Sequence, residues 1–380
     1  MAMPVPETTA RPRDKAYNRI KLRLSIADII LNLIIIALLA FSGISQALVA
    51  FITAYVANDY LVFFIFITLI GVLYSILDFP FDVYGGYVVE HRFGLSNQTP
   101  PAWLFEKLKG AAVGIVIGVP VALVFFFFLR MTGWLWWFYF SCFVFAISVF
   151  LARIAPVIIF PLFYKFKVLE SDEIRERITR LLDEQGIAIK GIFSFNLSKD
   201  TNKANAGFTG IGRSKRIILS DTLIGKFTPG EIAVVFAHEM GHYRKRHISK
   251  GIAFSTAAIF LSFFVCGEAY RVTLERLGFA HVFDIAAIPI LFFYLTLFSL
   301  ITMPLSNAVS RRHEREADRY AIDVTGDAAA FISSMEKLAD LNLADRDPNP
   351  VTEFMFYSHP AIRKRIEFAR QRLSDTGASS

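Results

Sequence analysis

Residues 238–242 read His-Glu-Met-Gly-His, a pattern that can hold a metal ion and activate water. In a helix, residues four apart lie on the same face, so the imidazoles of His238 and His242 can reach one ion. Zinc bound in this way lowers the pKa of its water to about 7. Glu239 lies between the two histidines and can take a proton from that water. The spacing therefore predicts a catalytic site with one Zn²⁺ per chain and Glu239 as general base.

A catalytic zinc also needs a third protein ligand and an open position for water. His247 follows the second histidine by five residues, so it turns away from the ligand face. The segment 307–323 offers two carboxylates, Glu314 and Glu316, which point in different directions on a helix, so only one can be the ligand. Asp318 shares a face with Glu314 and could hydrogen-bond a zinc-bound histidine, which favours Glu314. The alternative for this segment is a solvated helix of Arg–Glu pairs.

The motif requires a helix to position it, and 229–246 has the features of one. Pro229 stands near its start and Glu231 lies in its first turn, both favourable at a helix N-terminus. The motif follows an apolar stretch, which indicates a buried site rather than a surface helix that carries the pattern by chance. A further helix and two short strands are expected at 171–186, Ile192–Leu197 and Arg216–Leu219.

Composition predicts that much of the chain lies in a membrane. Of the 380 residues, 54% are hydrophobic and only 19% are charged, and the mean hydropathy is +0.48. Lipid is the natural environment for so much apolar surface. Six runs are long enough to span a bilayer: 24–42, 60–78, 110–129, 134–152, 250–270 and 286–306. The weaker run 43–58 leaves a seventh span possible.

Charge distribution predicts the orientation. Lys and Arg gather in 1–23, 153–249 and 307–380, whereas the loop 43–59 has none. Basic segments favour the cytoplasmic side, so six spans would place the zinc site there. The same bias accounts for the net charge of +7 without nucleic acid, for which no binding motif occurs. Four regions follow: a transmembrane region 1–152 of about four spans, a soluble segment 153–249 with the HExxH helix, a transmembrane hairpin 250–306, and a C-terminal segment 307–380 with the third ligand.

Together, these motifs resemble the type I CaaX prenyl endopeptidases, a family of integral-membrane zinc proteases. The matching segments, in chain order, are EHRFGLSNQT (90–99), PLFYKF (161–166), NAGFTGIGRSKRIILSDTLI (205–224), HEMGH (238–242), SRRHEREAD (310–318) and YSHPAIRKRIEF (357–368). The resemblance implies that Glu314 is the third zinc ligand and that Asp318 hydrogen-bonds a ligand. It also implies that a substrate strand pairs near Asn205 and Ala206, and that His359 stabilises the oxyanion of the tetrahedral intermediate.

The apolar runs and the two short strands predict a mainly α, polytopic membrane protein with six or seven transmembrane helices. A cytoplasmic zinc-protease domain with a small β element would complete it. The substrate would be a peptide or protein in contact with membrane lipid, prenylated in the CaaX case. The compact chain suggests a bacterial member in the inner membrane, where other membrane-associated peptides could be the substrates.

Two further functions fit parts of the sequence. Heat-shock membrane metalloproteases of the quality-control type share HExxH, but they have a shorter N-terminal membrane region. A transporter or lipid-binding membrane protein with an incidental HExxH would explain the spans. That reading predicts no metal, and it does not explain why 310–318 returns to the side that carries 238–242.

Overall fold

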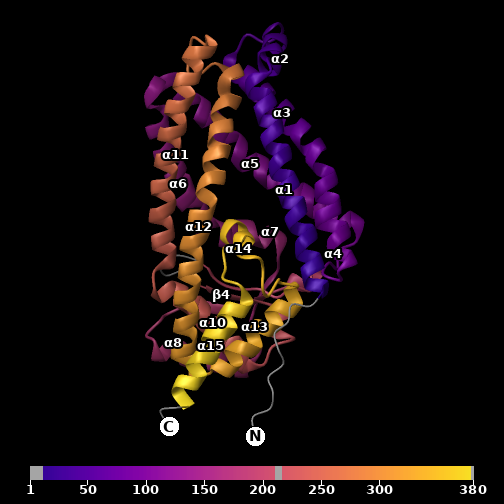
Figure 1. The fold of residues 1–380 in the computed structure, drawn as a ribbon, viewed down its shortest axis with the longest axis vertical. Helices are drawn as coiled ribbons and strands as arrows, with labels where there is room; N and C mark the ends of the chain where they lie inside the picture. Colours follow the sequence, from indigo (N-terminus) through magenta and orange to yellow (C-terminus); the bar gives the residue numbers. More distant parts are fainter. Residues whose placement is uncertain (1–11, 210–215, 378–380) are drawn as a thin grey trace.

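The computed structural model describes residues 12–209 and 216–377. Part of the basic N-terminal segment 1–23, and 210–215 within the segment 205–224, lie outside the described residues. Long helices form an elongated bundle at one end, and a mixed domain of helices and a small sheet forms the other (Figure 1). The start of α1 and the end of α15 both lie at the end with the sheet (Figure 1).

Each of the six predicted apolar runs lies in a long helix. These helices are α1 (Pro12–Phe41), α3 (Asp59–Asp82), α5 (Pro100–Thr132), α6 (Trp136–Ile154), α11 (His247–Leu277) and α12 (Ile288–Thr325). The described residues contain five candidate membrane spans, and one of them, Pro100–Phe163, includes both α5 and α6. The prediction of a mainly α, polytopic membrane protein with a small β element is therefore confirmed.

The weaker run 43–58 forms α2 (Ile44–Thr53), a helix of ten residues. At 1.5 Å per residue it is about 15 Å long, half of the roughly 30 Å of hydrocarbon that a span must cross. Gly43, with φ 84°, allows the sharp turn between α1 and α2. Ile52 packs into the bundle core, at the end far from the sheet (Figure 1). The long helices run between the two ends of the molecule, and α12 returns to the end where α1 starts (Figure 1).

The sheet has four strands in the order β1-β2-β4-β3. The predicted strands correspond to β2 (Gly191–Phe195) and β4 (Arg216–Ser220), which pair in parallel. Two further strands, β1 (Phe166–Val168) and β3 (Ala206–Thr209), were not predicted because each is too short to show an alternating pattern. Both pair antiparallel with their neighbours, so β3 lies at an edge of the sheet.

The remaining helices surround this sheet and connect it to the bundle. They are α4 (Val89–Arg92), α7 (Phe160–Phe163), α8 (Asp172–Glu184), α9 (Asp221–Ile224), α10 (Pro229–Arg244), α13 (Ala328–Asn342), α14 (Pro350–Phe356) and α15 (Ile362–Gly377). The predicted helices 171–186 and 229–246 are thus confirmed as α8 and α10.

A capping box begins α10 and binds it to α13. Thr228 accepts a hydrogen bond from the backbone N–H of Glu231, whose carboxylate accepts one from the N–H of Thr228. Lys337 and Ser333 of α13 donate to the same carboxylate at 2.7 and 2.5 Å. Burial opposes the charge on Glu231, but these hydrogen bonds outweigh it and lower the pKa of the carboxyl group. The start of the HExxH helix is therefore held both by its own capping box and by the contacts with α13.

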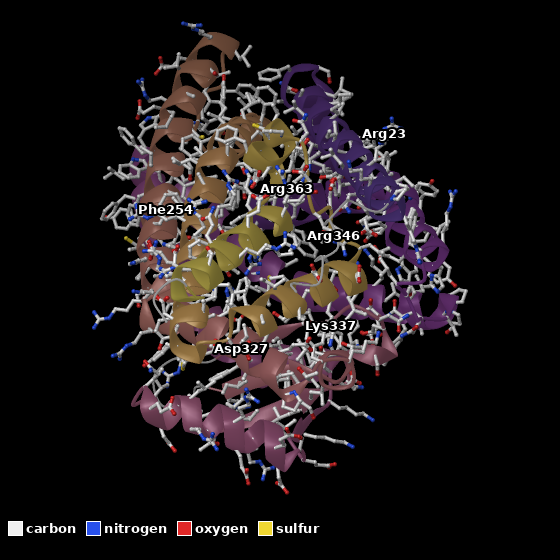
Figure 2. The ribbon with its side chains drawn as sticks, turned by 60° about the horizontal axis from the view of Figure 1, so that its bottom comes forward. Arg23, Phe254, Asp327, Lys337, Arg346 and Arg363 are labelled. Carbon is white, nitrogen blue, oxygen red and sulfur yellow. The ribbon has the colours of Figure 1, made fainter. Side chains whose placement is uncertain are left out.

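A buried ion pair joins the first helix to the C-terminal segment. Arg346, just after α13, lies where the C-terminal segment meets α1 (Figure 2) and pairs with Asp14 and Asp340. Asn18 of α1 donates to the carbonyl oxygen of Leu343 at 2.6 Å. Arg346 and Asp14 are both nearly inaccessible to solvent, so loss of either partner would leave an uncompensated buried charge. These contacts hold the membrane helices against the domain that carries the motif.

Candidate metal centre

The helices α10 and α12 pack along each other and bring three possible metal ligands together. Side-chain ligand atoms of His238, His242 and Glu314 all lie within 4.8 Å of one another. The two Nε2 atoms are 3.2 Å apart, and each is 3.3 Å from a carboxylate oxygen of Glu314. Tetrahedral zinc with bonds of about 2.0 Å would place its ligand atoms roughly 3.3 Å apart. The spacing therefore fits this metal.

Burial and hydrogen bonding of Glu314 also fit a metal ligand. Its residue is 6% exposed, and its Oε2 atom has no hydrogen-bond partner among the described residues. A buried acceptor without a donor is costly unless a cation or water binds it. The oxygen lies beside His238, so a bound cation would satisfy it.

Asp318 and Arg365 fix the orientation of His238. The Nδ1 atom of His238 is 2.9 Å from Asp318 Oδ1, and Arg365 donates to both carboxylate oxygens of Asp318 at 2.5 and 2.8 Å. Burial disfavours a charged imidazole, but the neighbouring carboxylates of Asp318 and Glu314 outweigh it and raise the pKa of His238 to about 9. The two carboxylates thus favour a positive charge at this position, which a bound cation would supply.

His242 has an outer partner that the sequence analysis did not identify. The Nδ1 atom of His247 lies 3.1 Å from His242 Nδ1, and its Nε2 atom lies 3.0 Å from Glu316 Oε2. His247 is thus outside the three-ligand group, as its spacing predicts, but it contacts a ligand. The backbone of Arg246 is left-handed, with φ 56°, and this turn between α10 and α11 brings His247 back. Glu316 therefore contacts His247 and none of the three ligands.

Close packing at Gly241 allows the two ligand-bearing helices to approach. A Cβ atom at this position would lie 3.0 Å from the Cα atom and 3.2 Å from the carbonyl oxygen of Ala317 on α12. Both are backbone atoms, which cannot rotate away. Only glycine therefore permits the helix separation at which Glu314 reaches the two histidines.

Replacing Gly241 by Ala is expected to force α10 and α12 apart. Overpacking of this kind costs about 1–3 kcal/mol, and the displaced ligands should bind metal more weakly. Thermal unfolding and competition with a metal chelator would measure both effects. Gly251→Ala is the matched control, because a Cβ atom there would meet nothing within 4 Å. Equal stability and metal affinity in the two variants would contradict this explanation.

A cavity of about 220 Å³ is lined by two of the three ligands, His238 and Glu314. Glu239, His359, Asn205 and Ala206 all contribute to its wall. The Nε2 atom of His359 is 3.5 Å from Glu314 Oε1, and its side chain is 60% exposed. Every residue that the sequence analysis assigned to catalysis or substrate binding therefore lies around one cavity, next to the ligand group.

The loop after α4 holds the chain that leads into β3. Asn97 donates its backbone N–H to the carbonyl oxygen of Asp200 at 3.0 Å and its side-chain amide to Ser198 at 2.8 Å. The N–H of Asn202 donates to the carbonyl oxygen of Leu95 at 2.9 Å. The segment 90–99 therefore positions the edge strand next to the cavity, which gives it a structural role in the site.

Known proteins resemble both halves of the chain. Residues 169–373 match peptidase family M48, and residues 7–165 match the CAAX prenyl protease N-terminal region of five membrane helices. The uncharacterized metalloprotease YhfN of Bacillus subtilis is 31% identical, over 93% of this chain and 84% of its own length. CAAX prenyl protease 1 of Saccharomyces cerevisiae is 32% identical, over 79% of this chain and 70% of its own.

A solved structure has the same fold. The crystal structure of Ste24p from S. mikatae superposes with a TM-score of 0.83 and 26% sequence identity. The match covers 94% of this chain and 88% of that chain. The similarity therefore extends through both the membrane helices and the domain with the sheet.

Proposed function

We propose that this chain, which belongs to peptidase family M48 and is a multi-pass membrane metalloprotease, is a zinc endopeptidase. Its zinc ligands would be His238, His242 and Glu314. The single observation that carries this proposal is the separation of the three ligand atoms by 3.2 to 3.3 Å, which fits tetrahedral zinc. Asp318 and His247 would orient the two histidines through their Nδ1 atoms, which would keep Nε2 directed at the ion. A bound zinc would supply a Lewis acid and lower the pKa of water.

Glu239 is the proposed general base. It lines the same cavity as His238 and Glu314, and it is next to His238 in the chain. In this scheme its carboxylate takes a proton from the attacking water and later returns it to the leaving amine. No other carboxylate outside the ligand group lines that cavity among the described residues.

The edge strand β3 is the proposed binding site for the substrate backbone. The carbonyl oxygen of Asn205 accepts a hydrogen bond from the backbone N–H of Ser220 on β4, and the N–H of Asn205 donates to the Ser220 hydroxyl. Backbone groups alternate in direction along a strand, so the N–H and C=O of Ala206 point away from β4. An extended peptide could therefore add to the sheet at Ala206, next to the metal ligands. This assigns the backbone contact to Ala206, while Asn205 fixes the strand.

A membrane-associated peptide or protein is the proposed substrate, as in CaaX processing. The support is the match of 7–165 to the CAAX prenyl protease N-terminal region, which also favours this activity over heat-shock quality control. The proposed substrates include prenylated peptides, and the proposed location is a bacterial inner membrane. Within the described residues, the Lys- and Arg-rich start of α1 and helices α8, α10 and α15 lie at the end with the sheet (Figure 1), which supports a cytoplasmic orientation of that end. The match to a peptidase family favours a protease over a transporter.

Metal removal and restoration would test this function. The purified protein, dialysed against a chelator, should lose cleavage of a CaaX-type peptide and of a non-prenylated control peptide. One equivalent of Zn²⁺ should restore it. Comparison of the two peptides would decide whether prenylation matters. A chelated protein that is metal-free by elemental analysis and still cleaves either peptide would refute the zinc mechanism.

His359→Ala is expected to lower kcat by about 10²–10³-fold, the usual effect of removing one donor to a developing oxyanion. The reason is its position at the cavity wall, 3.5 Å from Glu314. Zinc content should not change, and KM should change little. His281→Ala, which alters a histidine stacked on Phe283 in the loop between α11 and α12, is the control. A His359→Ala enzyme with full kcat would remove this residue from the mechanism.

A further inference from the structure

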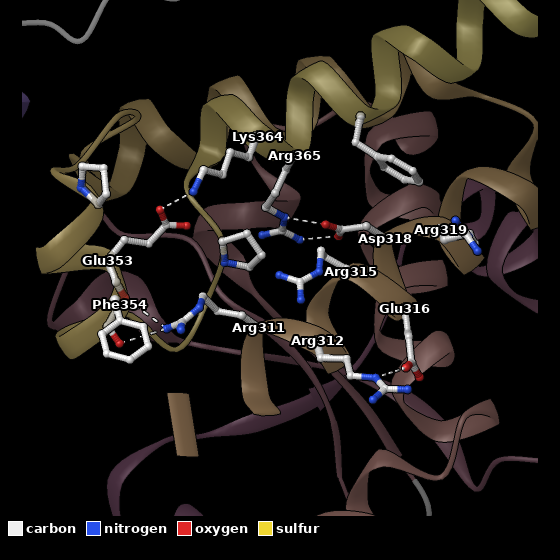
Figure 3. Close-up of a pocket in the computed structure, with 13 residues that line it drawn as sticks. Arg311, Arg312, Arg315, Glu316, Asp318, Arg319, Glu353, Phe354, Lys364 and Arg365 are labelled. Atoms are coloured by element: carbon white, nitrogen blue, oxygen red, sulfur yellow. Dashed lines mark hydrogen bonds and ion pairs between the residues drawn. The ribbon is translucent and has the colours of Figure 1, made fainter. Parts of the chain in front are cut away.

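A second cavity, of about 600 Å³, lies between α12, α14 and α15, and its wall is rich in arginine (Figure 3). Six cationic side chains line it, but only three carboxylates do. The cations are Arg311, Arg312, Arg315, Arg319, Lys364 and Arg365, and the carboxylates are Glu316, Asp318 and Glu353. The cavity therefore carries an excess of three positive charges.

Each of the three carboxylates pairs with a cationic side chain of the cavity wall. Arg312 pairs with Glu316 at 3.2 Å, Arg365 pairs with Asp318 at 2.5 Å, and Lys364 pairs with Glu353 at 2.5 Å. Figure 3 shows these three pairs around the cavity. None of these anions is therefore left to neutralise the remaining arginines.

The other three arginines have no carboxylate partner within the described parts of the chain. Arg311 donates instead to three backbone carbonyl oxygens at the end of α14, those of Glu353, Phe354 and Tyr357. Arg315 and Arg319 form no hydrogen bond or ion pair with any described residue. Both are exposed and lie one turn apart on α12. These two guanidinium groups are thus available to an anion from outside.

One face of α12 runs from apolar to cationic at this place. Ile301 and Leu305 are 77% and 59% exposed, in the apolar part of the helix that could lie in a membrane. Steps of three or four residues lead from them along the same face to Arg312, Arg315 and Arg319. Beside the cavity, Phe354 of α14 is also exposed, at 54%. A molecule that fits this face has an apolar chain and an anionic group.

We propose that this cavity binds the phosphate group of an anionic phospholipid, with Arg315 and Arg319 as its ligands. The acyl chains would lie along Ile301, Leu305 and Phe354. Basic side chains near the membrane surface attract anionic lipids, and the planar fork of arginine suits phosphate oxygens. This cavity shares the side chain of Arg365 with the cavity that Glu239 lines, but Arg315 and Arg319 line only the former, and the proposal does not depend on zinc or on peptidase activity.

Native mass spectrometry of the full-length protein in detergent would test the site. The probes are phosphatidylglycerol, phosphatidylcholine with the same acyl chains, and inorganic phosphate alone. Each basic residue contributes about fivefold to the affinity for anionic lipid. The Arg315→Gln/Arg319→Gln variant should therefore bind phosphatidylglycerol about 25-fold more weakly. Binding of phosphatidylcholine should not change.

Arg19→Gln/Arg23→Gln is the matched control, because these arginines are also exposed, four apart and near the same end of the bundle, on α1. This variant should bind phosphatidylglycerol like the wild type. Equal losses in the two double variants would overturn the site in favour of a general charge effect. Wild-type binding by Arg315→Gln/Arg319→Gln would also overturn it. Displacement of phosphatidylglycerol by inorganic phosphate at millimolar concentration would show that the cavity takes free phosphate, and would overturn the lipid.

Discussion

Replacing Glu239 by Gln is expected to abolish peptide cleavage and to leave the zinc in place. The amide keeps the size of the side chain but cannot accept the proton of the attacking water. Loss of a general base lowers kcat by about 10²–10⁴-fold, and the same group returns the proton to the leaving amine. Kinetics with a fluorogenic peptide, with elemental analysis of the same sample, would measure both properties. This variant separates catalysis from metal binding, because Glu239 is outside the ligand group of His238, His242 and Glu314.

The control for Glu239→Gln is Glu176→Gln, which makes the same chemical change at an exposed position on α8. It should retain full activity. If Glu239→Gln kept wild-type kcat with a full complement of zinc, another group would have to supply the base. If the variant lost zinc as well as activity, the structure around the metal site would have changed, and Glu239 would not be confined to catalysis.

Glu314→Ala is expected to remove zinc from the purified protein, whereas Glu316→Ala should retain it. Glu314 has a carboxylate oxygen 3.3 Å from each histidine Nε2, so its loss removes one of three ligands. The loss of affinity should exceed the 10–100-fold typical for an outer partner of a ligand. Glu316 contacts His247 instead, so its removal should fall within that smaller range. Zinc content after purification, and a chelator titration of each variant, would measure the difference.

The reverse pattern of zinc content would contradict the assignment of Glu314 as the third ligand. Loss of zinc in Glu316→Ala, with retention in Glu314→Ala, would move the third ligand and contradict the packing of α12 that turns Glu314 toward α10. Zinc loss in both variants would indicate that His247 and Glu316 matter more to His242 than the distances suggest. A wild-type protein that bound no zinc even when supplied with it would refute the proposed cofactor.

Features that depend on neighbours in the chain could be predicted from the sequence. The apolar runs predicted the long helices, because a helix in lipid satisfies its own backbone hydrogen bonds. The helix over 229–246 was predicted from Pro229 and Glu231, and the structure has α10 there with a capping box. The two histidines four residues apart lie on one face by helical geometry alone. These are local properties, which need no knowledge of the rest of the chain.

The sequence alone was less decisive where distant segments meet. It favoured Glu314 over Glu316 only through the position of Asp318 and a family resemblance, whereas in the structure α12 turns Glu314 toward α10 and Glu316 toward His247. It missed the contact between His247 and His242, which depends on the left-handed backbone of Arg246. The short strands β1 and β3 were missed for a related reason. Pairing with a neighbour, rather than a pattern of their own, determines them.

The tertiary structure alone decided three further features. The ion pair of Arg346 with Asp14 joins residues 332 positions apart, and neither residue belongs to a recognisable motif. Glycine is required at position 241 because a Cβ atom there would collide with the backbone of Ala317. The excess of arginine at the second cavity appears only when α14 and α15 pack beside α12. In each case the physical reason is the same: the energy of a contact depends on the distance between its groups in space, and that distance is set by the packing of the whole chain.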